Sequence, residues 1–207
     1  MKYIFTIAAL VCIILSATAQ QSTYVTASAY NTQNAMPFAK FSGLFNGVIH
    51  PGIELGYGKD VWKRSKHFWF LELKTGLFYH RYVQYGIPLY FDFGYNHVVA
   101  SGFSIKTSIG AGYMHSIPAA DKFKLNSNGE YKNNKGIGRM QAIATFGLGL
   151  EYRLKSTASR PVVIFTNYQQ RIQFPFVKSY VPFLPYNSFM IGIHLPVKKI
   201  NQKNKLK

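Results

Sequence analysis

Ionisable side chains stand at alternate positions of segments that are otherwise apolar, and these are the residues that could do chemistry. In the segment 68–82, Glu72 and Lys74 are two residues apart among aromatic and aliphatic side chains. Other apolar segments carry charges at equivalent alternate positions: Glu54, Asp92, Lys106, Glu151, Arg153 and Arg171. Acids and bases gathered in one place could form a structural ion-pair network, a proton relay or a path for a small solute.

Histidines are the second group of residues that could act on a substrate. The chain has six of them: His50, His67, His80, His97, His115 and His194. The one suggestive pair is His115 and Ser116, but adjacent strand residues point to opposite faces, so these two are not positioned to share a proton. No histidine spacing typical of metal sites and no phosphate-binding glycine loop occurs. We expect no catalytic residue, metal or cofactor, and we expect His50 and His194 to join the charged residues.

The elements that must position these side chains are β-strands, because the apolar pattern has a period of two. Around Glu72 the odd positions are apolar and the even positions carry the charges. The same alternation recurs in seven segments: 49–57, 69–80, 87–96, 103–113, 139–153, 162–172 and 189–195. An even strand count requires one more strand, which we expect within 22–32.

Bulky side chains decide which face of the strands lies inside. Trp, Phe, Tyr, Leu and Ile cover the apolar face, and they would overfill a barrel of about eight strands. Strand glycines gather on the polar face, where a crowded, concave lumen would need them. We therefore predict an all-β protein, a closed antiparallel transmembrane β-barrel of eight strands with a polar, filled lumen. The alternative is a soluble barrel that holds a ligand in an apolar interior.

Within the predicted barrel, the charged residues of the alternating segments all face the lumen. Four acids (Glu54, Glu72, Asp92 and Glu151) would meet four bases (Lys74, Lys106, Arg153 and Arg171). Because an unpaired buried charge costs several kcal/mol, this balance predicts an ion-pair network that fills a narrow lumen.

The connections between the strands are expected to differ at the two ends of the barrel. Short basic turns at 59–66 and 155–160 would face the periplasm, and longer loops at 33–46, 81–85, 117–138 and 174–187 would lie outside. Asn128-Gly129 predicts a hairpin within the third loop. The fourth loop is rich in proline and aromatic residues and is a candidate partner contact through Pro175, Phe176, Tyr180, Pro182, Phe183, Pro185 and Tyr186.

The first residues predict export. Lys2, an apolar run over 4–15 and Ala17-Thr18-Ala19 form a signal-peptide pattern over 1–19. The barrel domain would then span 20–197 and a basic tail 198–207. Cys12 is the only cysteine and falls in the signal, so disulfides and cysteine nucleophiles are excluded from the mature chain.

The charge is strongly basic, with 24 Lys and Arg against 7 Asp and Glu, a net charge of +17. In a cytosolic protein this balance would suggest nucleic acid, but export removes that partner. It points instead to outer-membrane lipids and lipopolysaccharide, or to other envelope proteins.

Several stretches carry a family resemblance: "SATAQQ", "TSIGAGYMHS", "ATFGLGLEYRL", "FKLNSNGEYKNNKGIGRMQ" and "FPFVKSYVPFLPYNSFMIGIHLPVK". Together they resemble the small outer-membrane β-barrel proteins of the Bacteroidota. The resemblance implies a fold and a location in the outer membrane of a Gram-negative bacterium. One departure is that Leu195-Pro196-Val197 precedes a lysine-rich tail, where such barrels often end on an aromatic residue.

Taken with the absent catalytic motifs, these features favour a non-enzymatic structural or interaction protein, such as an accessory subunit of an envelope complex. The alternatives are an outer-membrane lipid-modifying enzyme, which would use His115 or His80 with an unidentified hydroxyl, and a narrow solute channel.

Overall fold

The computed structural model describes residues 22–35, 43–121, 123–133, 136–154, 161–176 and 181–197. The predictions for the signal peptide, the turn 155–160, Tyr180 and the basic tail fall outside these residues. Within the described residues, no helix is long and apolar enough to cross a membrane.

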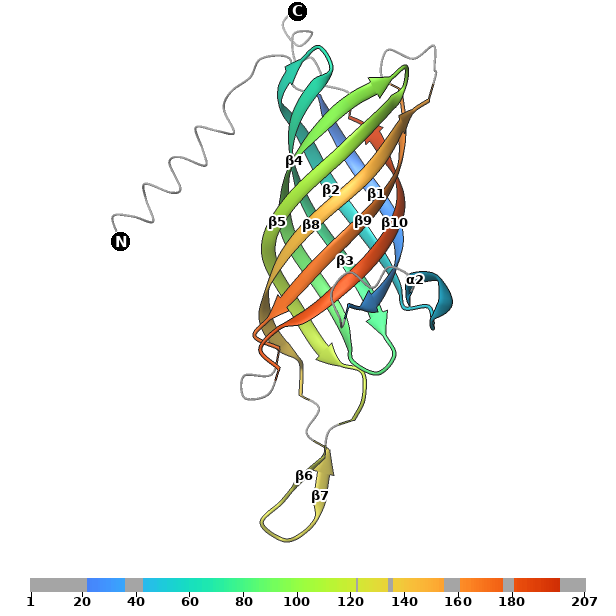
Figure 1. Ribbon diagram of the computed structural model, residues 1–207. Coiled ribbons are helices and arrows are strands. Elements are labelled where there is room, and N and C mark those ends of the chain that lie inside the picture. Colours follow the sequence, from blue (N-terminus) through green and yellow to red (C-terminus); the bar gives the residue numbers. More distant parts are fainter. Residues whose placement is uncertain are drawn as a thin grey trace, which may run out of the picture.

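Eight antiparallel strands form a closed barrel (Figure 1). They are β1 (Thr23–Asn34), β2 (Pro51–Arg64), β3 (His67–His80), β4 (Gln84–Ala100), β5 (Phe103–Pro118), β8 (Arg139–Arg153), β9 (Val163–Phe174) and β10 (Leu184–Pro196). Each strand pairs with its neighbour along the chain, and β1 pairs with β10 to close the barrel. The predicted closed eight-stranded barrel is therefore confirmed, including the strand expected within 22–32.

The two ends of the barrel differ in their connections. At one end, β2 and β3 are joined through Ser65 and Lys66, and β4 and β5 through Ser101 and Gly102. We call this the turn end; β1 begins and β10 finishes there, where the Val197 amide donates to the Thr23 carbonyl at 2.9 Å.

At the opposite end, which we call the loop end, the connections are longer. One of them contains the short helix α2 (Gly43–Asn46). Another carries the hairpin of β6 (Phe123–Leu125) and β7 (Tyr131–Asn133), which projects beyond the barrel (Figure 1). Gly129 has a φ of 76° in the turn of this hairpin, as the Asn-Gly signal predicts.

Burial alternates along each strand, and the polar face is the inner one. On β4 the even positions from Gln84 to Asn96 are buried or nearly so, with Asp92 fully buried, while the odd positions face outward. Apolar side chains cover the outside, and Ile109, for example, is 62% exposed. This inside-out arrangement is the one predicted, and it suits a bilayer because a soluble protein would not expose so continuous an apolar face.

Glycines on the inner face make room for rings that lie across the lumen. A Cβ atom at Gly94 would lie 2.2 Å from Cζ of Phe70, and one at Gly52 would lie 2.4 Å from Cζ of Tyr30. Such close approach is possible only where the wall has no side chain. The lumen is consequently packed with side chains rather than open.

Candidate functional site

Four buried carboxylates, each on a different strand, are the centre of the charged lumen. Glu54 on β2, Glu72 on β3, Asp92 on β4 and Glu151 on β8 have relative exposures of 9% or less. Glu72 lies directly opposite Asp92 in the β3–β4 register. Like charges placed opposite each other destabilise a sheet, so this pair requires a cation between them.

Lys74 supplies that cation. Its Nζ lies 3.0 Å from Asp92 Oδ2, 3.3 Å from Glu72 Oε2 and 3.7 Å from Glu54 Oε1. The ammonium group is itself buried and serves three carboxylates at once. Glu72 and Lys74, two residues apart in the sequence, are thus brought together by adjacent lumen-facing positions on β3.

Lys106 and Arg171 extend the cluster along the barrel in opposite directions. Lys106 Nζ is 3.2 Å from both carboxylate oxygens of Glu72 and 3.4 Å from Glu151 Oε1. Arg171 Nη2 is 3.6 Å from Glu54 Oε2 and donates to Gln169 at 2.9 Å. Arg171 is one of the largest fully buried side chains among the described residues.

The fourth base of the cluster is His194, as expected, and the prediction of Arg153 is wrong. His194 Nε2 is 3.2 Å from Glu151 Oε1, and its Nδ1 is 2.8 Å from Thr26 Oγ1. Arg153 has the correct alternation but is the last residue of β8, where its side chain is exposed at the rim. The remaining seven predicted residues do come together.

We call the assembled group the charge network: Glu54, Glu72, Lys74, Asp92, Lys106, Glu151, Arg171 and His194. Neutral side chains complete it, since Tyr90 donates to Glu54 at 2.6 Å and Thr145 donates to Asp92 at 2.8 Å. Asn96 also donates to Glu151. The network contains four acids, two lysines, one arginine and one histidine.

A second polar group, which sequence reasoning missed, lies at the loop end of the lumen. We call it the amide cluster: Gln84, Ser116, Gln141, Gln173 and Tyr186. Gln84 and Gln173 exchange hydrogen bonds of 2.6 and 3.0 Å, and Gln84 Nε2 also lies 3.0 Å from the Tyr186 hydroxyl. Ser116 donates to Gln84, and Gln173 donates to Gln141. The sequence signal is Gln169 and Gln173, which flank Arg171 at lumen-facing positions of β9.

The predicted partner-contact loop is divided between the lumen and the surface. Gln141 Nε2 donates to the Pro175 carbonyl at 2.7 Å, and Phe176 packs on the buried cluster at the loop end. Pro182 and Phe183 are exposed. Two of the seven predicted residues are not in a loop at all, because β10 begins at Leu184: these are Pro185 and Tyr186, both of which are buried.

The histidines outside the charge network are not arranged around a nucleophile. The His115 ring nitrogens lie 3.0 Å from the Tyr113 hydroxyl and 2.9 Å from the Ile137 carbonyl. Ser116 points into the lumen instead, as strand alternation predicts.

His50 and His80 stack at the loop end with ring centroids 3.7 Å apart, so His50 lies outside the charge network. Burial lowers the pKa of His50, and a backbone hydrogen bond with Thr32 opposes that shift. Burial is the larger of the two effects, and it favours the neutral form of His50. In the part of the chain that the structure describes, no three His, Cys, Asp or Glu residues form a group that could hold a metal ion.

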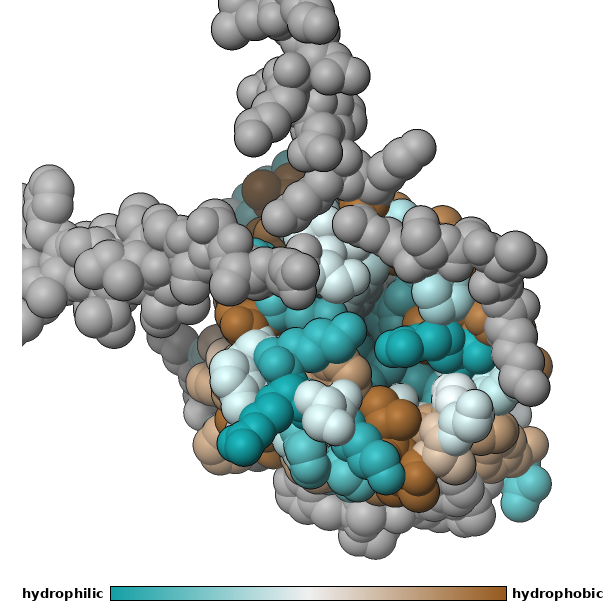
Figure 2. Space-filling view, turned by 90° about the horizontal axis from the view of Figure 1, so that it is seen from above, coloured by the Kyte–Doolittle hydropathy of each residue, from teal (hydrophilic) through white to brown (hydrophobic). Residues whose placement is uncertain are grey.

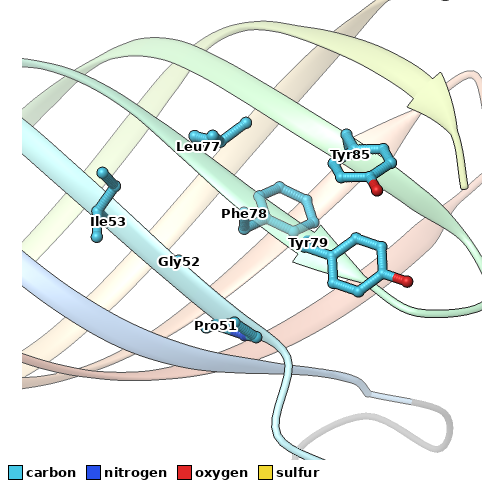
Figure 3. Close-up of a pocket in the computed structure, with 7 residues that line it drawn as sticks. All are labelled: Pro51, Gly52, Ile53, Leu77, Phe78, Tyr79 and Tyr85. Carbon is cyan, nitrogen blue, oxygen red and sulfur yellow. The ribbon is translucent and has the colours of Figure 1, made fainter.

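The outer surface is apolar around the barrel wall. Viewed from the turn end, hydrophilic residues gather over the mouth and hydrophobic residues around the rim (Figure 2). A shallow pocket opens between β2, β3 and β4 near the loop end (Figure 3), lined by Pro51, Gly52, Ile53, Leu77, Phe78, Tyr79 and Tyr85. Its two tyrosine rings have centroids 4.8 Å apart, which is the aromatic border expected where lipid tails meet head groups.

No protein-family model and no curated protein sequence matches the chain. Among solved structures, neisserial surface protein A is 7% identical, with 86% of this chain and 98% of that chain covered and a TM-score of 0.54. Ail, the attachment invasion locus protein of Yersinia pestis, is 11% identical over 86% and 97%, with a TM-score of 0.41. The N-terminal β-barrel domain of Pseudomonas aeruginosa OprF is 13% identical over 85% and 100%, with a TM-score of 0.38. At such low identity the likeness to neisserial surface protein A is one of fold: the chain has the fold of an eight-stranded outer-membrane barrel.

Proposed function

We propose that the chain is a non-enzymatic β-barrel of the outer membrane of a Gram-negative bacterium, acting as a structural or interaction protein of the envelope. The apolar outer wall supports insertion in a bilayer. Short turns at one end and longer loops at the other support an orientation with the turn end in the periplasm and the loop end outside. Export by the predicted signal peptide is part of the same proposal.

The observation that carries this function is the filled lumen. The charge network occupies it from the turn end through the middle, and the amide cluster occupies the loop end. Side chains that are paired in this way hold the wall together and leave the interior without a solute path. The surfaces left for function are therefore the outer wall, which contacts lipids and lipopolysaccharide, and the projecting loops.

The β6–β7 hairpin is the surface best suited to a protein partner. Leu125 lies opposite Tyr131 in the hairpin register, and both side chains are exposed, Tyr131 to 76%. Phe123 is exposed as well. A lone two-stranded hairpin is marginally stable in water, and clustered exposed apolar residues mark interaction sites. The hairpin supports a role as an accessory subunit that presents this ribbon outside the membrane.

Purification in mild detergent tests the proposal. We expect a stoichiometric envelope protein to copurify with the intact chain, and we expect it to be lost when residues 123–133 are replaced by a short glycine-serine linker. Comparing the gel mobility of boiled and unboiled samples verifies that the intact chain and the linker variant are both folded barrels. A folded barrel that never carries a partner would contradict the proposal.

The two alternatives have separate tests. An unchanged lipid A mass spectrum after gene deletion would argue against lipid modification, for which His115 gives no support because its ring nitrogens face a tyrosine and a carbonyl. Planar-bilayer recordings test the channel. We expect no conductance from the natural chain. A measurable conductance would contradict the structural role of the lumen side chains.

A further inference from the structure

Three rows of outward-facing residues lie near the turn end: two cross β2, β3 and β4, and one crosses β3 and β4 beside Lys59 of β2. Leu71 lies opposite Phe93 in the row furthest from the turn end, which we call the apolar row. The next is the aromatic row, Trp62, Trp69 and Tyr95, in which each residue lies opposite its neighbour. The last is the basic row, Arg64, His67 and His97, paired in the same way.

The aromatic row contains both tryptophans of the chain. Trp62 and Trp69 are 47% and 38% exposed on the outer face, and the Trp69 ring lies 5.1 Å from Tyr95 and 5.3 Å from Phe93. Tryptophan and tyrosine prefer the level at which lipid tails meet head groups. The residues between this row and the turn end are therefore placed at the level of the lipid phosphates.

The basic row is held in position by contacts to the aromatic row and to the turn. Nδ1 of His67 contacts the Tyr95 hydroxyl, and it lies 3.3 Å from Nδ1 of His97. Because the Nδ1 atoms face each other, the Nε2 atoms are the ones left to donate to a ligand. The Lys66 carbonyl accepts from the Val98 amide at 2.8 Å, which fixes the turn beside His97.

The charges around the basic row favour an anion. Arg64 lies directly opposite His67, and Lys66 follows in the turn. A β-bulge between Asp60 and Trp62 shifts the register, and Asp60 on its far side pairs with Phe70, whose side chain is buried in the lumen. Asp60, the only acid in the segment 59–67, thus faces the lumen and not the outer surface. A metal cation at the basic row would be repelled by Arg64.

We propose that these rows bind the phosphate of an anionic phospholipid, such as phosphatidylglycerol, in the leaflet at the turn end. Arg64, Lys66 and the two histidines receive the phosphate, the aromatic row contacts the glycerol region, and the acyl chains lie along Leu71 and Phe93. The site rests on the proposed bilayer insertion and adds a lipid class and a location to it.

The two tryptophans provide a direct test, since they are the only ones in the chain and both lie in the site. The full-length protein is reconstituted in bilayers of phosphatidylcholine and phosphatidylglycerol, in which one lipid at a time carries brominated acyl chains that quench tryptophan fluorescence. We expect brominated phosphatidylglycerol to quench more strongly than brominated phosphatidylcholine at equal mole fraction. We expect Arg64→Gln to reduce this preference about fivefold, since one basic residue near an anionic surface contributes that much to binding.

Arg153→Gln is the matched control, because it removes one exposed arginine from the same end of the barrel at the end of β8. It should leave the preference unchanged, while His97→Asn should reduce it. Equal quenching by the two lipids, or an equal effect of the two arginine variants, would overturn the site while leaving bilayer insertion intact. Absence of quenching by either lipid would overturn insertion as well. A preference abolished by soluble glycerol phosphate would assign the basic row to free phosphates and overturn the lipid proposal.

Discussion

The charge network and the amide cluster fill the same lumen with different chemistry. In the charge network both lysines are shared: Lys74 lies within 4 Å of three carboxylates and Lys106 within 4 Å of two. In the amide cluster the partners are neutral, and Gln84 meets Gln173, Ser116 and Tyr186. A buried charge that loses its partner costs several kcal/mol, whereas a neutral amide that loses one costs less. The charge network therefore depends on every member, and the amide cluster does not.

The position of each group fits this difference. The charge network lies where the wall is continuous strand, so its geometry is set by strand register. The amide cluster lies where the strands pass into loops, and Gln141 bonds a loop carbonyl at Pro175. Neutral amides, which both donate and accept, can follow a loop that shifts, because no charge is left alone when one bond is exchanged for another.

The largest expected effect is from Lys74→Met, which leaves Glu72 and Asp92 facing each other without their cation. We expect the free energy of unfolding to fall by about 3–5 kcal/mol. Urea titration of the barrel in lipid vesicles measures it. Lys124→Met on the exposed hairpin is the matched control and should change little. A loss below about 1 kcal/mol would show that the network is not interdependent.

His194→Leu should have the next largest effect, because it removes hydrogen bonds to Glu151 and Thr26. We expect a loss of about 1.5–3 kcal/mol, the range for hydrogen bonds to charged groups. A double-mutant cycle with Glu151→Gln checks the assignment, since residues in contact give a combined cost that differs from the sum. If the losses in the free energy of unfolding from His194→Leu and Glu151→Gln were strictly additive, His194 would not belong to the charge network.

In the amide cluster, Gln84→Leu should cost about 1–2 kcal/mol, less than either change in the charge network. The remaining amides of Gln173 and Gln141 can still bond each other. Gln170→Leu on the lipid-facing side of β9 is the matched control and should be neutral or stabilising in a bilayer. If Gln84→Leu were as costly as Lys74→Met, the contrast between the two groups would be lost.

The smallest effect belongs to Arg153→Gln, the residue that alternation alone assigns to the network. Since its side chain is exposed at the rim of β8, we expect the free energy of unfolding to change by less than about 0.5 kcal/mol. The same urea titration measures it. A loss comparable to that of His194→Leu would return Arg153 to the charge network.

Alternation predicted the barrel and the face of each residue because a period of two is a local property of the chain. It correctly identified seven of the eight predicted charged residues, including Glu72 and Lys74, and it also placed His194 in the network. It could not exclude Arg153, because alternation gives the face of a strand and not the depth along the barrel. Depth depends on the stagger between neighbouring strands, such as Thr26 opposite His194, which involves residues far apart in sequence.

The loop-end residues were harder to predict for a different reason. Pro182 and Pro185 make the segment before β10 resemble a loop, yet the strand begins at Leu184 and Tyr186 becomes part of the lumen. Similarly, Gln84 was expected in a loop and is the first residue of β4. Strand ends are set by pairing with a neighbour, and proline at the start of a strand does not prevent it.

The bond between Val197 and Thr23 makes the barrel a ring whose order of strands has no natural beginning. Joining these two residues by a short linker and opening the chain between Ser101 and Gly102 would yield a circular permutant with every strand pair preserved. The most distant pairing would then move from β1–β10 to β4–β5, and with it the contact whose loop-closure entropy is largest. The route by which the barrel closes is therefore a property of where the ring is cut, while the closed structure is not.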